Sequence, residues 1–164
     1  MLISLQTGSY TGANDGRLSS CYARAVPPSS DSRRLAGILL IVLPSVMYGG
    51  VSLLTMLIRD PAYMANPLRQ NLWRAGHAHA GVLLVLALVC LRYVDEANLS
   101  DGMRRVARSS VPAAAILMPA GLFLSMVSPR ATAPNGLIAL TFVGAAVLAI
   151  GVIVLGVGLI RRPG

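Results

Sequence analysis

Hydrophobic positions in this chain form four long runs separated by short polar segments. The runs cover about residues 35–58, 75–94, 110–127 and 137–160. Each run is long enough to cross a bilayer as a helix, because the hydrocarbon core needs roughly 20 apolar residues and lipid offers no partner to an open backbone. The pattern predicts an all-α, polytopic membrane protein with four transmembrane helices in an up-down bundle.

The segments outside this transmembrane domain, 35–160, are polar. Residues 1–34 are rich in Ser and Gly and lack periodicity. Such a segment buries too little apolar surface to offset the entropy of ordering, so we expect a disordered tail. There are two alternative explanations for this segment: a start codon assigned too far upstream, or an organellar transit peptide. Residues 161–164 form a short basic C-terminus.

Composition supports a membrane protein. The chain is 55% hydrophobic and 12% charged, and its mean hydropathy is +0.67, far more apolar than a soluble domain. All 14 basic residues are Arg, which together with abundant Ala, Gly, Val and Leu indicates a high-GC, bacterial coding sequence. The net charge of +8 does not indicate nucleic-acid binding, because the arginines lie between apolar runs and not along one face.

The distribution of arginines predicts the orientation. Ten lie in the tail, the second loop and the C-terminus, whereas four lie in the first and third loops, namely Arg59, Arg69, Arg74 and Arg130. Positive residues near span ends stay on the cytoplasmic side. We therefore expect a multi-pass protein of the cell membrane with both termini cytoplasmic. A short helix starting near Ser100 or Asp101 is predicted to lie on the inner leaflet.

Small residues recur along three of the predicted spans. They are Gly144, Gly151 and Gly158 in the fourth, Ser45, Gly49 and Ser52 in the first, and Ala114, Gly121 and Ser125 in the third. In lipid, helices associate where small residues let their backbones approach closely. The stripes predict either a compact bundle or self-association, and Pro44 and Pro119 allow kinks.

The chemistry-bearing stretch is RAGHAHAG, residues 74–81, at the start of the second span. Two residues apart on a helix are rotated by about 200°, so His77 and His79 face nearly opposite ways. In an alternating bundle we expect them level with the residues Ser52, Thr55, Met56, Ser125, Met126 and Thr141. One interpretation is structural: one imidazole bonds to Thr55, Ser125 or Thr141, and the other lies at the interface.

The second interpretation is a redox centre with haem b or copper. Neutral imidazole ligates both metals, Met56 or Met126 could complete a His/Met pair, and Arg69 or Arg74 would lie near porphyrin carboxylates. A proton or ion pathway is the third interpretation. We expect His77 to matter more, because Gly81 lies on its stripe and leaves room one turn deeper, whereas His79 shares the more apolar stripe of Leu83, Leu86 and Cys90.

The stretch RAGHAHAGVLLVLALV resembles the H-x-H helix openings of small haem-copper-oxidase-like and nitric-oxide-response membrane proteins. The region from Tyr48 to about Val94 is similar to bacterial four-span membrane proteins. The resemblance implies a metal-binding helix opening at His77 and His79. Haem-copper oxidases draw ligands from several helices, and this chain departs from them because it has no further histidine.

Other catalytic arrangements are not found in the sequence, which lacks a phosphate-binding loop and paired carboxylates within a span. We therefore interpret the chain as an accessory or partner-binding helical bundle and not as an independent enzyme. Its expected partners are the lipid bilayer and either a second copy or a larger membrane complex, with no nucleic acid.

Overall fold

The computed structural model describes residues 27–161; most of the predicted tail, 1–26, and residues 162–164 lie outside this range. The described part is all-helical. Its elements are α2 (Ser30–Arg59), α3 (Pro61–Met64), α4 (Pro67–Tyr93), α5 (Asp101–Leu124), the 3-10 helix η1 (Gly136–Ile138) and α6 (Ala139–Ile160). Four helical segments, with η1 and α6 counted together, are long and apolar enough to cross a membrane. The predicted four-span, all-α fold is therefore confirmed.

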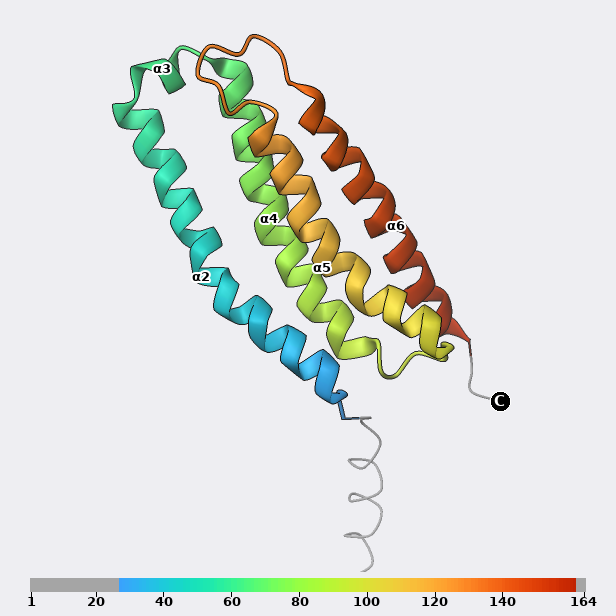
Figure 1. The fold of residues 1–164 in the computed structure, drawn as a ribbon. Coiled ribbons are helices and arrows are strands. Elements are labelled where there is room, and N and C mark those ends of the chain that lie inside the picture. Colours follow the sequence, from blue (N-terminus) through green and yellow to red (C-terminus); the bar gives the residue numbers. More distant parts are fainter. Residues whose placement is uncertain (1–26, 162–164) are drawn as a thin grey trace, which may run out of the picture.

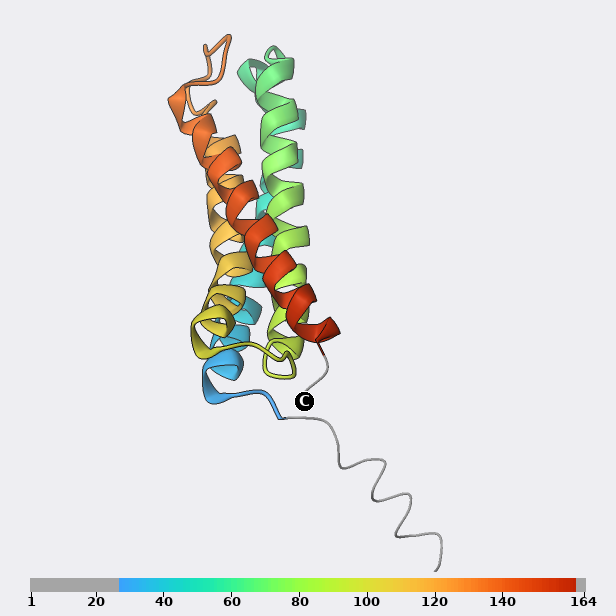
Figure 2. The same cartoon turned by 90° about the vertical axis from the view of Figure 1, so that its right-hand side faces the viewer.

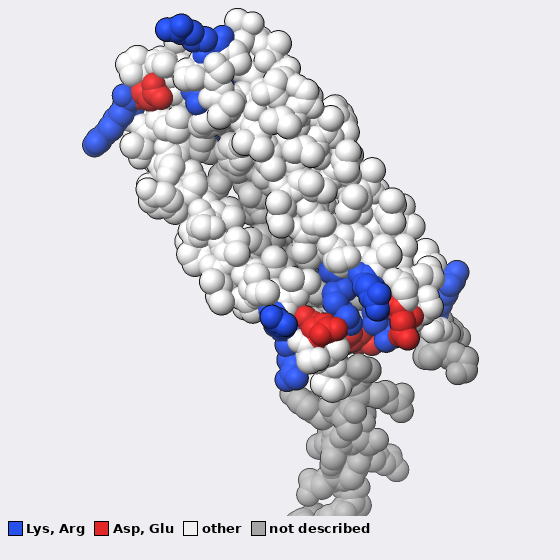
Figure 3. Space-filling model, in the orientation of Figure 1, with Lys and Arg blue, Asp and Glu red and all other residues white. Residues whose placement is uncertain are grey.

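The four long helices run up and down in the order α2, α4, α5, α6 (Figure 1). Helix α3 lies at one end of the bundle, here called the α3 end, and the described chain starts and finishes at the opposite end, here called the termini end. Figure 2 shows α6 crossing the bundle obliquely. Charged side chains gather at the two ends, and the visible face between them is free of charge (Figure 3). This arrangement suits a bundle that spans a bilayer.

Helix starts follow local capping chemistry and lie earlier than the apolar runs suggested. The Ser29 side chain accepts from Ser32 N–H and starts α2. Asn66 caps α4, whose first residue is Pro67, a position where the missing proline N–H costs nothing. These helices therefore extend beyond the hydrocarbon core, into segments whose polar residues the hydropathy pattern assigned to a tail and a loop.

The predicted separate surface helix after Ser100 is wrong. Helix α5 does start at Asp101, but it continues without a break to Leu124. Ala107 is 1% exposed and Val111 is fully buried, so one side of this segment packs on the protein core, whereas Met103 and Val106 stay exposed. The tertiary contacts of small residues such as Ala107 decide its position, and hydropathy does not record them.

Glycines hold α5 and α6 in close contact. A methyl group at Gly121 would lie 2.6 Å from the Thr141 backbone nitrogen, and one at Gly144 would lie 3.0 Å from that of Met118. Gly151 lies against Ser110. The predicted stripe of the fourth span therefore serves packing within the chain, because glycine alone lets these backbones approach so closely.

Helix α2 is peripheral. No residue in its most apolar 18-residue stretch is buried, whereas 44% of the corresponding stretch of α5 is. Helix α2 packs mainly on α4 and contributes only Leu39 to the hydrophobic core, whose other described residues come from α4, α5, α6 and the segment between α4 and α5. Pro44 lies in the middle of α2, where Figure 1 shows the helix bending, because proline removes one hydrogen bond of the helix ladder.

Candidate functional site: a histidine-lined cavity between two spans

His77 of α4 points at the backbone of α2. A methyl group at Gly50 would lie 2.9 Å from His77 Nε2, and one at Gly49 would lie 3.7 Å from Nδ1. The two glycines therefore make room for the imidazole between the helices. Within the described residues His77 forms no hydrogen bond, so its ring N–H is available to a ligand.

A cavity of about 340 Å³ adjoins this imidazole. Helix α2 contributes Gly50, Leu53, Leu54 and Leu57, α3 contributes Tyr63, and α4 contributes Arg74 and His77. Leu54 and Arg74 are exposed, so the cavity opens to the surface of the bundle beside them. It combines an apolar wall with three polar side chains, which is the usual composition of a small-molecule site.

Tyr63 is positioned by a short helix that the sequence encodes locally. Asp60 Oδ1 accepts from the backbone N–H groups of Ala62 and Tyr63, at 2.9 and 3.2 Å, and Pro61 supplies the first helical residue. This turn directs Tyr63 inward, where it is 1% exposed. Burial raises the pKa of the Tyr63 phenol, against the opposing charges of Arg74 and Arg69. Its hydroxyl has no hydrogen-bond partner in the part of the chain that the structure describes.

Arg69 lies in an aromatic cluster formed by Tyr63, Trp73 and Phe123. Its guanidinium carbon is 4.1 Å from the Trp73 ring centroid and 6.0 Å from that of Tyr63. Trp73 Nε1 donates to the Phe123 carbonyl at 3.1 Å, which joins α4 to the end of α5. Arg69 is 6% exposed and bonds to Val127 O at 3.3 Å. Of the two arginines predicted for a porphyrin, only Arg74 therefore lines the cavity with His77.

His79 faces elsewhere, as predicted from the rotation between the two histidines. Its Nδ1 lies 2.7 Å from the Ala75 carbonyl of the same helix, so the tautomer with Nδ1–H donates there. Leu83 and Cys90 on its predicted stripe are buried, at 4% and 7% exposure. A histidine with a backbone partner in its own helix has less free hydrogen-bonding capacity than His77.

The structural interpretation expects a hydrogen bond from one histidine to a neighbouring helix. Among the described residues, neither histidine forms such a bond. Thr55 and Ser125 donate to carbonyls of their own helices, at 2.9 and 3.0 Å. Thr141 donates to Met118 O of α5 at 3.3 Å and so joins α6 to α5. His77 lies beside Gly49 and Gly50, which precede the expected neighbours Ser52, Thr55 and Met56 along α2.

The predicted haem or copper site stays a prediction. Met126 follows the end of α5 and is fully buried, and Met56 is half-buried on α2. Neither methionine lines the cavity with His77. In the described part of the chain no three or more His, Cys, Asp or Glu side chains gather as metal ligands would.

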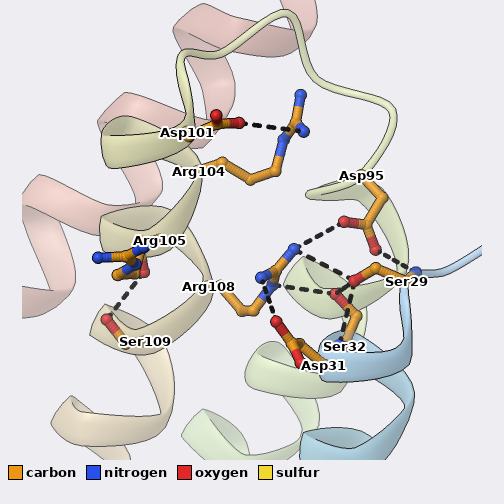
Figure 4. Close-up of polar contacts among 9 residues, drawn as sticks. All are labelled: Ser29, Asp31, Ser32, Asp95, Asp101, Arg104, Arg105, Arg108 and Ser109. Carbon is orange, nitrogen blue, oxygen red and sulfur yellow. Dashed lines mark hydrogen bonds and ion pairs between the residues drawn. The ribbon is translucent and has the colours of Figure 1, made fainter.

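A second polar cluster closes the termini end. Figure 4 shows Arg108 of α5 pointing between the start of α2 and Asp95, which follows α4. Its guanidinium lies 2.9 Å from Asp95 Oδ1 and 3.2 Å from both the Ser29 and Ser32 hydroxyl oxygens. Asp31 Oδ2 lies 3.4 Å away. These five residues are here called the Arg108 cluster.

The Arg108 cluster holds three helices together through one carboxylate. Burial raises the pKa of Asp95, but hydrogen bonds from Ser29, Ser32 and Arg108 outweigh burial, so the pKa of Asp95 lies below its usual value. Ser29 N–H donates to Asp95 Oδ2 at 2.8 Å. The start of α2 is therefore tied to α4 and α5 at this end.

Sequence reasoning missed Tyr63, Gly50 and the Arg108 cluster. Tyr63 falls in the first loop of the hydropathy pattern, although Asp60-Pro61 is a helix-start signal that could have shown a separate turn. The doublet Gly49-Gly50 within an apolar run is a signal for close approach by a neighbour. The buried positions of α5 begin at Ala107, before the predicted span. This periodicity is a signal that could have placed Arg108 on a helix continuous with the span.

Comparison with protein-family models, curated proteins and solved structures finds no match to this chain. The fold and the cavity define an all-helical membrane bundle with a pocket of mixed apolar and polar lining between α2, α3 and α4.

Proposed function

We propose that this chain is a non-catalytic integral membrane protein that acts as an accessory subunit by binding a transmembrane helix of another protein along α2. Helix α2 supports this proposal because it adds little to the core. It contacts mainly α4, and its apolar stretch is not buried. A span that contributes so little to its own bundle is free to pack against a partner.

The observation that carries the proposal is the position of Tyr48. It is 73% exposed on α2, and its hydroxyl has no partner among the described residues. Ten residues separate it from Ile58, which is about 15 Å at 1.5 Å per residue and so near the middle of a bilayer core about 30 Å thick. Facing lipid, the hydroxyl would lose its hydrogen bonds with water at a cost of about 1–3 kcal/mol. An acceptor on a partner helix offsets this cost.

Photo-crosslinking in native membranes tests the proposal. A photoreactive residue at Ile41 of α2, 79% exposed, is compared with one at Phe142 of α6, 71% exposed. We expect a protein adduct from position 41 and only lipid adducts from position 142. An adduct of twice the monomer mass would identify the partner as a second copy. Lipid adducts alone from both positions, together with a bare monomer in mild detergent, would contradict the proposal.

The substitution Tyr48→Phe sharpens this test. Because the hydroxyl has no hydrogen-bond partner among the described residues, we expect unchanged folding and a threefold to tenfold loss of the adduct from position 41, equivalent to about 0.6–1.4 kcal/mol. Tyr93→Phe is the matched control. Tyr93 lies at the end of α4, where water reaches it, and its substitution should leave the adduct unchanged.

We also propose that both termini are cytoplasmic. Seven described arginines lie at the termini end by their positions along the helices, namely Arg33, Arg34, Arg92, Arg104, Arg105, Arg108 and Arg161, against Arg59, Arg69, Arg74 and Arg130 at the α3 end. Arg69 is buried, which supports the bias further. A reporter fused after Gly164 should be active in the cytoplasm; activity only on the other side would reverse the orientation.

A further inference from the structure

Three of the residues that line the cavity between α2, α3 and α4 carry hydrogen-bond donors. The Tyr63 hydroxyl is buried without a partner, the His77 imidazole keeps at least one N–H in either protonation state, and Arg74 adds a guanidinium. Arg74 has one bond, to Asn71 Oδ1 at 3.0 Å, which leaves further donors free. An unsatisfied buried hydroxyl costs about 1–3 kcal/mol, so a ligand acceptor would gain from meeting it.

The polar end of the cavity has an excess of positive charge. None of its lining residues carries a carboxylate. Asp60, beside α3, already accepts from two backbone N–H groups. Arg69 adds charge nearby through its contact with the Tyr63 ring. Because the Tyr63 pKa is raised by burial, the hydroxyl stays protonated at neutral pH and donates. The ligand group that matches this end is therefore an anion with several acceptor oxygens.

The other wall of the cavity is apolar and leads to the surface. Leu53, Leu54 and Leu57 line it, and Leu54 is 56% exposed. The volume of about 340 Å³ equals about eleven waters at about 30 Å³ each. This is room for a carboxylate or phosphate and several methylenes, with the remaining chain leaving sideways between α2 and lipid.

We propose that this cavity binds an anionic amphiphile, whose carboxylate or phosphate headgroup is held by Tyr63, His77 and Arg74 and whose acyl chain lies along Leu53, Leu54 and Leu57. The headgroup satisfies the Tyr63 hydroxyl and balances Arg74, and the chain covers the exposed leucines. The proposal does not depend on the partner helix, because the residues that hold the headgroup lie on α3 and α4.

Binding to the purified full-length chain in neutral detergent tests the ligand class. The probes are hexadecanoate, hexadecyl phosphate, hexadecanol and inorganic phosphate, followed through Trp73, the single tryptophan. We expect both anionic amphiphiles to bind, hexadecanol to bind at least tenfold more weakly, and inorganic phosphate not to compete. Equal binding of hexadecanol would overturn the anion site. Competition by inorganic phosphate at comparable concentration would overturn the amphiphile and point to a soluble anion.

Two substitutions test the residues. Tyr63→Phe and Arg74→Gln should each weaken hexadecanoate binding about tenfold, a loss typical of one hydrogen bond to a charged group. Arg59→Gln is the matched control, because Arg59 is exposed near the same end and does not line the cavity. Without ligand, Tyr63→Phe should keep or raise the Tm, since it removes an unpaired buried hydroxyl. Unchanged binding in both variants would overturn the assignment.

Discussion

The pair α5–α6 and the pair α2–α4 are both antiparallel neighbours, but they are packed differently. Between α5 and α6, glycines at positions 121, 144 and 151 face backbone or Cβ atoms of the opposite helix. Between α2 and α4, Gly49 and Gly50 face the imidazole of His77, and a cavity lies beside it. One pair uses glycine to bring backbones together, and the other uses it to admit a polar side chain.

The α5–α6 interface is therefore purely structural, whereas the α2–α4 interface has room and polar groups for a ligand. Dispersion contacts between helices depend on close approach, and an interface closed by backbone contacts has no room for a ligand. Among the described residues, the α2–α4 pair keeps a free imidazole, that of His77, and the unpaired Tyr63 hydroxyl lies in α3 at its end. Its ends are closed instead, by α3 at one end and by the Arg108 cluster at the other.

Breaking the α5–α6 contact should have the largest effect on stability. Gly121→Ala puts a methyl group 2.6 Å from the Thr141 backbone nitrogen, and backbone cannot move aside as a side chain can. We expect a loss of about 2–3 kcal/mol in detergent unfolding followed through Trp73. Gly156→Ala is the control in the same bundle, because nothing lies within 4 Å of the added methyl group. Its stability should be unchanged or slightly higher, and equal losses in the two variants would refute the packing argument.

Releasing α2 at the termini end should have the next largest effect. Arg108→Gln leaves the Asp95 carboxylate, whose side chain is 9% exposed, without its cation. We expect a loss of about 2 kcal/mol, below the range for fully buried pairs because the Arg108 side chain is 18% exposed. Crosslinks between the start of α2 and α5 should also weaken. Arg105→Gln, at an exposed arginine of the same helix, should leave both stability and crosslinks as they are.

Low pH should also weaken the attachment of α2 at the termini end, because it protonates Asp95. The Asp95 pKa is lower in the folded chain than in the unfolded chain, so its stabilising contribution is complete above the unfolded value near 3.9 and is lost as pH falls through the folded value. Tm measured between pH 7 and pH 3 should therefore fall in the wild type. Asp95→Asn should start lower and show a shallower fall, and parallel profiles would exclude Asp95 as the titrating group.

The smallest effect is expected at the α2–α4 pair. Gly50→Ala crowds His77 Nε2 at 2.9 Å, but the imidazole is a side chain that can rotate into the adjacent cavity. The crowding and the gain in helix propensity, about 1 kcal/mol, largely cancel. We expect a net change under about 1 kcal/mol by the same unfolding measurement. A loss as large as that of Gly121→Ala would remove the contrast between the two pairs.

The sequence by itself determined the class of the protein. Four apolar runs, each near the thickness of a bilayer, leave helices as the simplest way to satisfy the backbone, and the four-span, all-α fold is confirmed. The opposite facing of His77 and His79 also follows from helix geometry alone. The glycine stripe of the fourth span was also recognised from the sequence, but the helix that packs against it was not.

Only the tertiary structure decided which helix each small residue faces and which polar groups meet. A stripe such as Gly144, Gly151 and Gly158 has the same pattern whether it meets α5 or a second chain. Tyr63 and His77 lie fourteen residues apart on different helices, so no local spacing predicts that they line one cavity. Arg108 and Ser29 meet only because the start of α2, the last turn of α4 and the start of α5 lie at the same end of the bundle. Local patterns fix element type and face, whereas depth and pairing depend on helix ends, kinks and contacts far apart in the chain.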